Sequence, residues 1–394
     1  MTRQPSCDIA VVGGGVVGAA TALAFARLGM SVSLIEARVP APWSADAPDL
    51  RVYALAPDTV AWLDALGAWD PVRHARAHRY LRMRVRDAAG GGELGFDADA
   101  MGRPELGWIV EHGLLVDRLW AAMAQAGVAV HSGIAVERLG QDPATATLGL
   151  ADGSRLAARL VVAADGAASV VRGLAGIEVD GQGHGQRAIV GYVRGTRSHE
   201  DTAWQRFLPG GPLALLPFGD AGHASSIVWT LPEEEAVRLL ALPDAAFGQA
   251  LTRASDRWLG DLAPVSPRAA FPLRTQLARS QLSGRVVVVG DAAHVVHPLA
   301  GQGVNLGLRD AAALHRHAIA TIAASRDWAG DAGLARWARE RRSDAVVSAR
   351  AFAAINRVFS NEAAAPVALR GPLLGLAGWI APLRRALWRH AAGG

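Results

Sequence analysis

Residues Asp8-Ile-Ala-Val-Val-Gly-Gly-Gly-Val-Val-Gly18 decide how this chain folds. A short apolar run suits a buried parallel strand, and the glycines that follow it have the spacing Gly-x-Gly-x-x-Gly. A helical pattern rich in alanine covers Ala19–Leu28, and a second apolar strand, Ser31–Ile35, ends at Glu36. This order of strand, glycine loop, helix, strand and acid predicts a βαβ unit that binds a dinucleotide.

The glycine loop and the acid have separate tasks in such a unit. Gly13, Gly15 and Gly18 allow a tight turn, close approach of a diphosphate, and close packing of helix on strand. The positive end of the helix dipole favours phosphate at the same place. Glu36 can accept hydrogen bonds from both ribose hydroxyls, and its charge disfavours the 2′-phosphate of NADP.

Two later segments carry matching signals. Residues 160–172 place Asp165-Gly166 after an apolar strand, with a serine and an arginine at helical spacing beyond. Residues 290–310 place Asp291 between a run of valines and a loop rich in glycine that leads into a helical pattern. A strand, an acidic turn, a glycine loop and a helix N-terminus in this order suit a flat, phosphorylated cofactor. Asp291 then becomes the candidate ligand of its ribityl hydroxyls.

Composition bounds the class of protein. The chain has 394 residues, 51% apolar and 19% charged, which is an ordinary globular balance with room for two domains. Its net charge is only +4 and every basic residue is arginine, so the high isoelectric point does not indicate a nucleic-acid partner. Cys7 is the one cysteine and excludes an internal disulfide. Because no apolar run reaches about 18 residues, we expect a cytoplasmic protein, with peripheral contact to the inner face of the membrane as an alternative.

Together the three segments match the fingerprint set of the class A flavoprotein aromatic hydroxylases, which the chain resembles from its first strand to about residue 320. Within that family the likeness is to the ubiquinone-biosynthesis hydroxylases. The stretches that carry it are Asp49–Leu55, Trp108–His112, His297–Gly307, Val358–Asn361 and Pro382–Leu387. The chain departs from the group at Ala56-Pro57, where a small polar pair is usual, and at His112, where Asn is usual.

The resemblance implies a bound FAD, dioxygen as co-substrate, and NADPH or NADH as a transient donor, since no second Gly-x-Gly-x-x-Gly loop is present. It places Gly13, Gly15 and Gly18 at the pyrophosphate, with Glu36 at the adenosine ribose. The other cofactor-binding residues it implies are Arg38, Arg51, His112, Asp165 and Asp291. The loop it places along the flavin edge consists of Pro298, Gly301, Gln302, Gly303, Val304 and Asn305. No catalytic side chain is predicted, because the cofactor carries the chemistry.

These observations predict an α/β fold with a discontinuous Rossmann-like FAD-binding domain, formed by residues 1–75, 107–180 and 271–345. Residues 76–106 and 181–270 form an inserted, mainly antiparallel sheet domain for the substrate, and Trp229 is a candidate to line its cavity. Residues 346–394 form a helical C-terminal segment. Its part 369–389 mixes Leu, Trp and Arg, which suits a docking helix or a surface for anionic lipid or a biosynthetic complex.

We therefore expect a monooxygenase that hydroxylates the ring of an apolar, prenylated phenol or quinone precursor in ubiquinone biosynthesis. One alternative is a hydroxylase of a soluble secondary metabolite. Another is a flavin dehydrogenase or prenyl reductase that needs no oxygen, and a third is a subunit that holds flavin for assembly. No metal is expected, since nothing nearby completes a site around His294 and His297.

Overall fold

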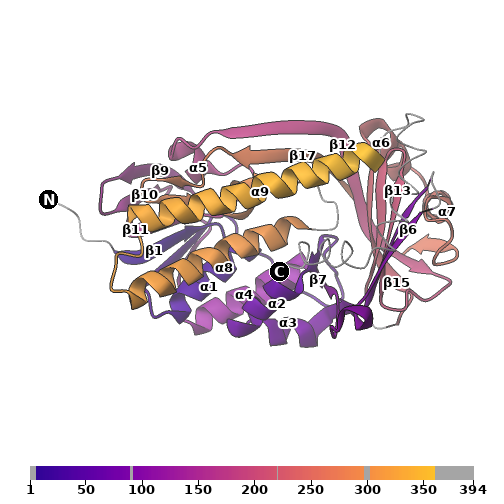
Figure 1. Ribbon diagram of the computed structural model, residues 1–394, viewed down its shortest axis with the longest axis horizontal. Helices are drawn as coiled ribbons and strands as arrows, with labels where there is room; N and C mark the ends of the chain where they lie inside the picture. Colours follow the sequence, from indigo (N-terminus) through magenta and orange to yellow (C-terminus); the bar gives the residue numbers. More distant parts are fainter. Residues whose placement is uncertain (1–5, 89–91, 220, 297–301, 360–394) are drawn as a thin grey trace.

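The structure is a computed structural model that describes residues 6–88, 92–219, 221–296 and 302–359. Two large sheets lie at opposite ends of the molecule (Figure 1). A long helix, α9 (Asp331–Phe359), runs along both of them and touches β18 (Leu282–Ser283) in one sheet and β17 (Ala269–Ala278) in the other. Within the described residues, no helix is both long and apolar enough to span a membrane.

The first sheet has a parallel core in the order β19-β11-β1-β2-β8, continued by β18 at the β19 edge. These strands are β1 (Cys7–Val12), β2 (Val32–Glu36), β8 (Ala129–Ser132), β11 (Arg155–Ala163), β18 (Leu282–Ser283) and β19 (Val286–Val288). Strands β9 (Val136–Gln141) and β10 (Ala146–Leu150) extend β11 in antiparallel fashion. Because β1 is central and buried, the glycine loop after it opens at the carboxyl edge of the sheet, where α/β folds bind ligands.

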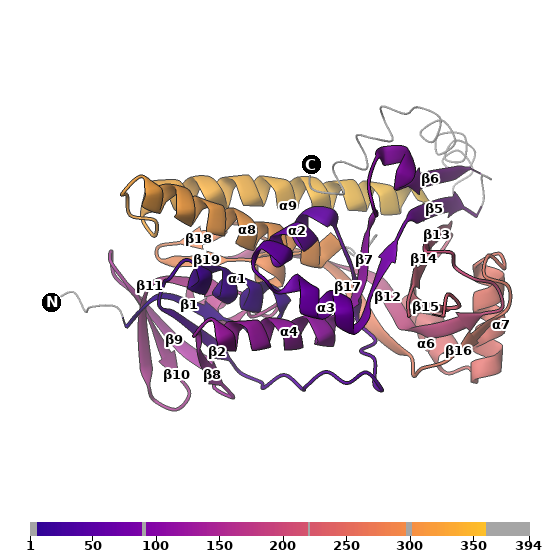
Figure 2. The same ribbon diagram turned by 90° about the horizontal axis from the view of Figure 1, so that it is seen from below.

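Three helices cover one face of this sheet (Figure 2). They are α1 (Val16–Arg27), α4 (His112–Gln125) and α8 (Gln302–Ala323). The alanine-rich sequence of α1 lets it lie close to both neighbours, and Ala19, Ala20 and Phe25 are fully buried there. The predicted βαβ unit is therefore confirmed.

The second sheet has the order β20-β17-β12-β15-β14-β13-β5-β6, with β16 beside β12. Its strands are β5 (Arg82–Asp87), β6 (Glu93–Asp97), β12 (Val179–Gly195), β13 (Thr202–Leu208), β14 (Gly211–Pro217), β15 (Ala224–Pro232), β16 (Leu262–Pro264), β17 (Ala269–Ala278) and β20 (His294–Val295). Within the described residues, the strand pairs of this sheet are antiparallel except β13 with β5, which is parallel. That parallel pair joins a strand from residues 76–106 to the strands from residues 181–270 in one sheet, which also includes β17 and β20.

Smaller elements connect the two sheets. A three-stranded sheet has the order β3-β7-β4, and α6 and α7 pack on the outer face of the second sheet. The remaining elements are β3 (Val52–Leu55), β4 (Ala77–Tyr80), β7 (Gly107–Glu111), α2 (Pro57–Ala65), α3 (Trp69–Arg76), α5 (Val170–Leu174), α6 (Glu233–Leu240), α7 (Asp244–Ala254) and the short 3-10 turns η1 (Asp99–Met101) and η2 (Gly290–Ala292). The predicted α/β fold with separate parallel and antiparallel sheets is confirmed.

Candidate functional site

The glycine loop packs against the turn that follows β11. A Cβ atom at Gly13, whose φ is +105°, would lie 2.3 Å from the carbonyl oxygen of Ala164. A Cβ at Gly18 would lie 1.9 Å from the carbonyl oxygen of Gly13. Both positions therefore need glycine for packing, and they hold the first and second fingerprint segments together.

The third segment joins them through glycines of its own. Gly290 has φ +60°, in the region that favours glycine. A Cβ at Gly307 would lie 2.7 Å from Val17 Cγ2 and 2.9 Å from Gly290 Cα. Since these positions carry no side chain, α8 lies close to both α1 and the turn that holds Asp291.

The N-terminus of α1 is arranged for an anion. Gly15 occupies the N-cap without a side-chain cap, and a Cβ there would meet no atom within 4 Å. The first turn has no acidic residue, so its N–H groups and the positive helix end face open space. Glu36, at the end of β2, accepts hydrogen bonds from the N–H groups of Gly14 (2.5 Å) and Arg38 (2.9 Å). These features fit a diphosphate at the helix with a ribose at Glu36.

Asp165 has a different local role from the other acids. One of its carboxylate oxygens accepts a hydrogen bond from Ser169 Oγ, and the other accepts one from Val171 N at 3.1 Å. The buried Arg172 donates to the carbonyl of Ala292 at 2.8 Å, beside Asp291. The serine and arginine that accompany Asp165 in the sequence therefore build the turn and tie it to the third segment.

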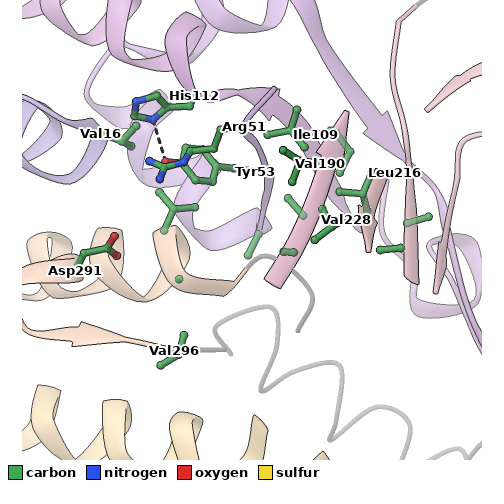
Figure 3. A pocket seen from close by; sticks show the side chains of 18 of the residues that line it. Val16, Arg51, Tyr53, Ile109, His112, Val190, Leu216, Val228, Asp291 and Val296 are labelled. Carbon is green, nitrogen blue, oxygen red and sulfur yellow. Dashed lines mark hydrogen bonds between the residues drawn. The ribbon is translucent and has the colours of Figure 1, made fainter. Parts of the chain in front are cut away.

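A cavity of about 570 Å³ extends from the glycine loop to the second sheet. Its polar end contains Arg51, Tyr53, His112 and Asp291 (Figure 3). Tyr53 Oη lies 2.9 Å from His112 Nδ1. Burial raises the pKa of Tyr53 to about 12, and burial together with the charge of Arg51 lowers the pKa of His112. At neutral pH both groups are therefore uncharged, and a hydrogen bond joins the phenol to the imidazole.

The other end of the cavity is apolar. Figure 3 shows Val190, Leu216 and Val228 of the second sheet on the side away from Asp291. Strands β4 to β6 add Tyr80, Met83 and Phe96. A hydrophobic molecule can therefore lie on the sheet while its end reaches the fingerprint segments.

The predicted residues divide by position. Those that line the cavity are Gly15, Arg51, His112, Asp291, Gly303 and Val304. Glu36 and Arg38 lie at the end of β2, and Arg38 is exposed. Gln302 begins α8, while Pro298 and Gly301 lie outside the described residues.

Asn305 is fully buried and does not line the cavity. Its Oδ1 accepts hydrogen bonds from Ala56 N and Thr59 Oγ1, both at 2.8 Å, and its Nδ2 donates to the Ala54 carbonyl at 2.8 Å. The side chain that we placed along the flavin edge thus joins α8 to β3 and α2 instead. Its position in the first turn of α8 explains this, because successive residues of a helix face different directions.

Two further features differ from the expectations. Trp229 packs against Phe247 on the outer side of the second sheet, so the prediction that it lines the cavity is wrong. Its neighbour Val228 lines the cavity, because adjacent strand residues face opposite sides. His294 Nε2 lies 2.6 Å from Asp310 Oδ2 in a fully buried pair that sequence reasoning missed.

One group of side chains within the described residues has metal-ligating atoms within 4.8 Å of one another: His78, His199 and Asp201. His199 Nδ1 accepts the N–H of Asp201 at 3.1 Å, and His78 Nε2 bonds to Asp201 Oδ1 at 2.9 Å. These two hydrogen bonds join the three residues to one another, and no metal is assigned to the group.

Comparison with known proteins agrees with this geometry. A family profile described as an FAD binding domain matches residues 6–350. The chain is 38% identical to ubiquinone hydroxylase UbiL of Rhodospirillum rubrum, over 98% of this chain and 89% of that protein. It is 36% identical to 3-demethoxyubiquinol 3-hydroxylase of Escherichia coli, over 87% of each chain.

Among solved structures, p-nitrophenol 4-monooxygenase of Pseudomonas putida superposes with a TM-score of 0.79 at 22% identity, over 98% of both chains, and so shares the fold. The family match covers all three fingerprint segments and both sheets. The chain therefore belongs to the FAD-binding family of class A flavoprotein hydroxylases.

Proposed function

We propose that this chain hydroxylates the aromatic ring of a prenylated phenol or quinone precursor in ubiquinone biosynthesis, with dioxygen and NADPH or NADH as co-substrates. The observation that carries the proposal is a continuous cavity whose polar end is formed by the fingerprint segments and whose other end lies on a mainly apolar sheet face. Relatives at 36% and 38% identity are named for hydroxylation of ubiquinone or its demethoxy precursor. A lipophilic ring suits this apolar end better than a soluble metabolite with many polar groups.

In this proposal the protein binds and orients both partners. The first turn of α1 holds the diphosphate, Glu36 the ribose, and Asp291 the ribityl chain. Gly303 and Val304 bring the N-terminus of α8 to the cavity, where its dipole favours the negative charge of a reduced flavin. When bound, FAD supplies the activation of oxygen, and the apolar walls exclude water from the reaction. The nicotinamide donor binds transiently, because the sequence has a single dinucleotide fingerprint.

Turnover in an atmosphere of ¹⁸O₂ tests the chemistry. The purified protein, supplied with FAD, NADPH and a demethoxyubiquinol that bears a short prenyl chain, should give a hydroxylated ring with one labelled oxygen. Oxidation of NADPH with an unlabelled product would indicate the dehydrogenase or reductase instead. Failure to oxidise NADPH with any prenylated phenol would favour a subunit that only holds flavin.

Deletion of the gene tests the pathway. The deletion strain should accumulate a quinone precursor that lacks one ring oxygen, and the wild-type protein should restore the pool. A Gly15→Ala protein, expected to fold but to bind FAD weakly, is the matched control and should restore it poorly. An unchanged quinone pool in the deletion strain would refute the pathway assignment.

A further inference from the structure

One polar residue lies in an otherwise apolar row across the second sheet. The strand pairing places Val85, Gln205, Ala214, Val228 and Val190 side by side on β5, β13, β14, β15 and β12. Residues in one cross-strand row share a face, and Ala214, Val228 and Val190 of this row line the cavity. Gln205 is therefore the only member of the row that can form hydrogen bonds through its side chain.

Gln205 is 7% exposed, lines the cavity, and makes no side-chain hydrogen bond to any residue that the structure describes. A side-chain amide has two donors and a strong acceptor, and burying them without partners is unfavourable. Its strand neighbour Trp204 faces the opposite side, where its ring stacks on Trp258 at 4.8 Å. The unpaired amide thus points into the space available to a ligand.

A second polar group belongs to the same wall. Tyr80 lines the cavity, and its hydroxyl likewise has no hydrogen bond to a described residue. Burial raises its pKa to about 12, so the phenol remains a donor at neutral pH. Its ring lies over Gly107, where a Cβ would come within 2.8 Å of the Tyr80 oxygen. Other residues that line the sheet end of the cavity, among them Val190, Leu216 and Val228, are apolar.

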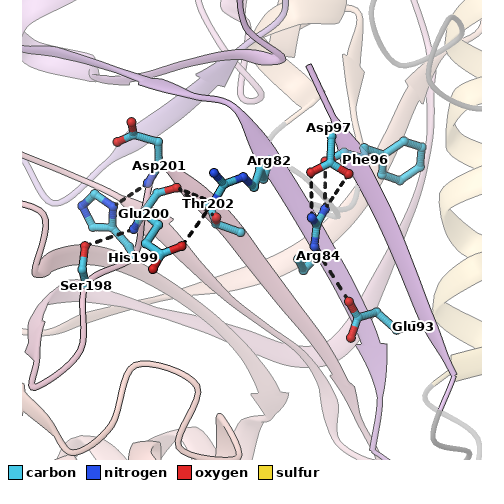
Figure 4. A network of polar contacts seen from close by, with 10 residues as sticks. All are labelled: Arg82, Arg84, Glu93, Phe96, Asp97, Ser198, His199, Glu200, Asp201 and Thr202. Carbon is cyan, nitrogen blue, oxygen red and sulfur yellow. Dashed lines mark hydrogen bonds and ion pairs between the residues drawn. The ribbon is translucent and has the colours of Figure 1, made fainter. Parts of the chain in front are cut away.

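The outer face of β5 holds this wall in place (Figure 4). Arginines alternate with Met83 and Val85 along the strand. Arg84 pairs with Asp97 of β6 at 2.7 Å, and Arg82 pairs with Glu200 beside the start of β13 at 3.2 Å. Together with the parallel pairing of β5 and β13, these contacts fix the hairpin β5–β6 beside the strand that carries Gln205.

We propose that Gln205 is a specificity-determining residue that hydrogen-bonds an oxygen substituent of the substrate ring and thereby orients the ring toward the fingerprint segments. The Tyr80 hydroxyl supplies a second polar contact, and the apolar rows hold the hydrocarbon part. The inference takes the identity of the ring from the proposed function, but what it states is that Gln205 recognises an oxygen on that ring.

A binding titration tests this claim without turnover. The FAD-loaded, oxidised protein is titrated with 2-geranylphenol and with geranylbenzene, which differ by one ring oxygen, and binding is followed by the flavin absorbance spectrum. The wild-type protein should bind the phenol more tightly. Gln205→Met should weaken binding of the phenol by about three- to tenfold, as expected for one lost hydrogen bond, and leave geranylbenzene unchanged.

Val228→Ala is the matched control, since it changes the same row without changing its polarity. It should affect both probes alike. Gln205→Leu repeats the test if the methionine variant loses its FAD. The proposal is overturned if the wild-type protein does not discriminate between the probes, or if the Gln205 variants shift both equally or neither.

Because no reductant is present, no turnover occurs, and the result of the titration does not depend on the proposed function. A protein that prefers the phenol through Gln205 yet never hydroxylates a demethoxyubiquinol would refute the proposed function alone. In turnover, Gln205→Met should also lower the amount of hydroxylated product per NADPH consumed, because a misoriented ring reacts less efficiently. A purely structural role for Gln205 would instead lower the FAD content and the melting temperature.

Discussion

Alanine at Gly15 and at Gly18 should separate the cofactor-binding role of the glycine loop from its packing role. At Gly15 the new Cβ meets no atom within 4 Å, and φ of −68° is accessible to alanine. Alanine is a poorer N-cap than glycine, but it also lowers the entropy of the unfolded chain, and each effect is below about 1 kcal/mol. The free energy of unfolding without FAD should therefore change by less than about 1 kcal/mol.

At Gly18 there is no space for the same methyl group. Its Cβ would lie 1.9 Å from Gly13 O and 3.1 Å from Ala164 Cβ, well inside the roughly 3.5 Å of an ordinary non-bonded contact. The start of α1 must then move away from β1, although this helix is buried along most of its length. Overpacking of this kind costs about 1–3 kcal/mol, and we expect the upper end because both contacts involve rigid atoms.

Urea denaturation without added FAD and fluorescence titration with FAD measure the two effects separately. Gly15→Ala should unfold like the wild type but bind FAD at least about tenfold more weakly, because its methyl group displaces a phosphate that accepts charge-assisted hydrogen bonds. Gly18→Ala should lose stability first and affinity as a consequence. Wild-type FAD affinity in Gly15→Ala, or wild-type stability in Gly18→Ala, would refute the reasoning.

Three further predictions concern residues around the site. Burial opposes the charged form of His294, but Asp310 and its hydrogen bond outweigh this and raise the pKa of His294 above its ordinary value of 6.5. The pair therefore stabilises the fold fully below pH 6.5, and this stabilisation declines as pH rises through the folded-state pKa of His294. Asp310→Asn should cost about 3–5 kcal/mol of unfolding free energy near pH 6 and less near pH 9. Urea denaturation at both pH values measures this cost, and a larger cost near pH 9 than near pH 6 would contradict the prediction. Asn305→Ala should cost at least about 2 kcal/mol in the same assay, since it leaves the buried Ala56 N–H and Ala54 carbonyl unpaired; a neutral effect would argue against these bonds. Glu36→Gln should weaken FAD binding about tenfold in a fluorescence titration, because it removes a charged acceptor. An unchanged affinity would show that the ribose does not bind to Glu36.

The sequence alone predicts the polar end of the site well because its geometry depends on local backbone requirements. Gly13 and Gly18 are needed wherever a helix packs tightly on the preceding strand, and that need leaves a fixed spacing in the chain. Ser169 and Arg172 likewise follow Asp165 at short range, and their contacts stabilise one turn. A pattern within about twenty residues can report such constraints.

Contacts between distant segments leave no such pattern. The segment 38–50 is rich in proline and forms no helix or strand. Its Trp43, however, donates to the fully buried Glu111 at 3.2 Å, and that carboxylate pairs with Arg76 at 2.7 Å. Neither partner is marked by its local sequence, because a charged residue at a strand end ordinarily faces solvent. The same limit led to the wrong face for Trp229, since alternation alone does not say which side of a strand borders the cavity.

The two ends of the cavity therefore differ in how well they tolerate substitution. Its polar end depends on glycines whose replacement disturbs the backbone, so that end is fixed for one cofactor. Its apolar end depends on cross-strand rows such as Val85, Gln205, Ala214, Val228 and Val190, whose side chains can change without moving the strands. One amide in such a row can thus decide which ring is held while FAD binding stays the same. It follows that substrate preference in this chain should respond to Gln205 variants that leave FAD affinity unchanged, and FAD affinity to Gly15 variants that leave the sheet intact.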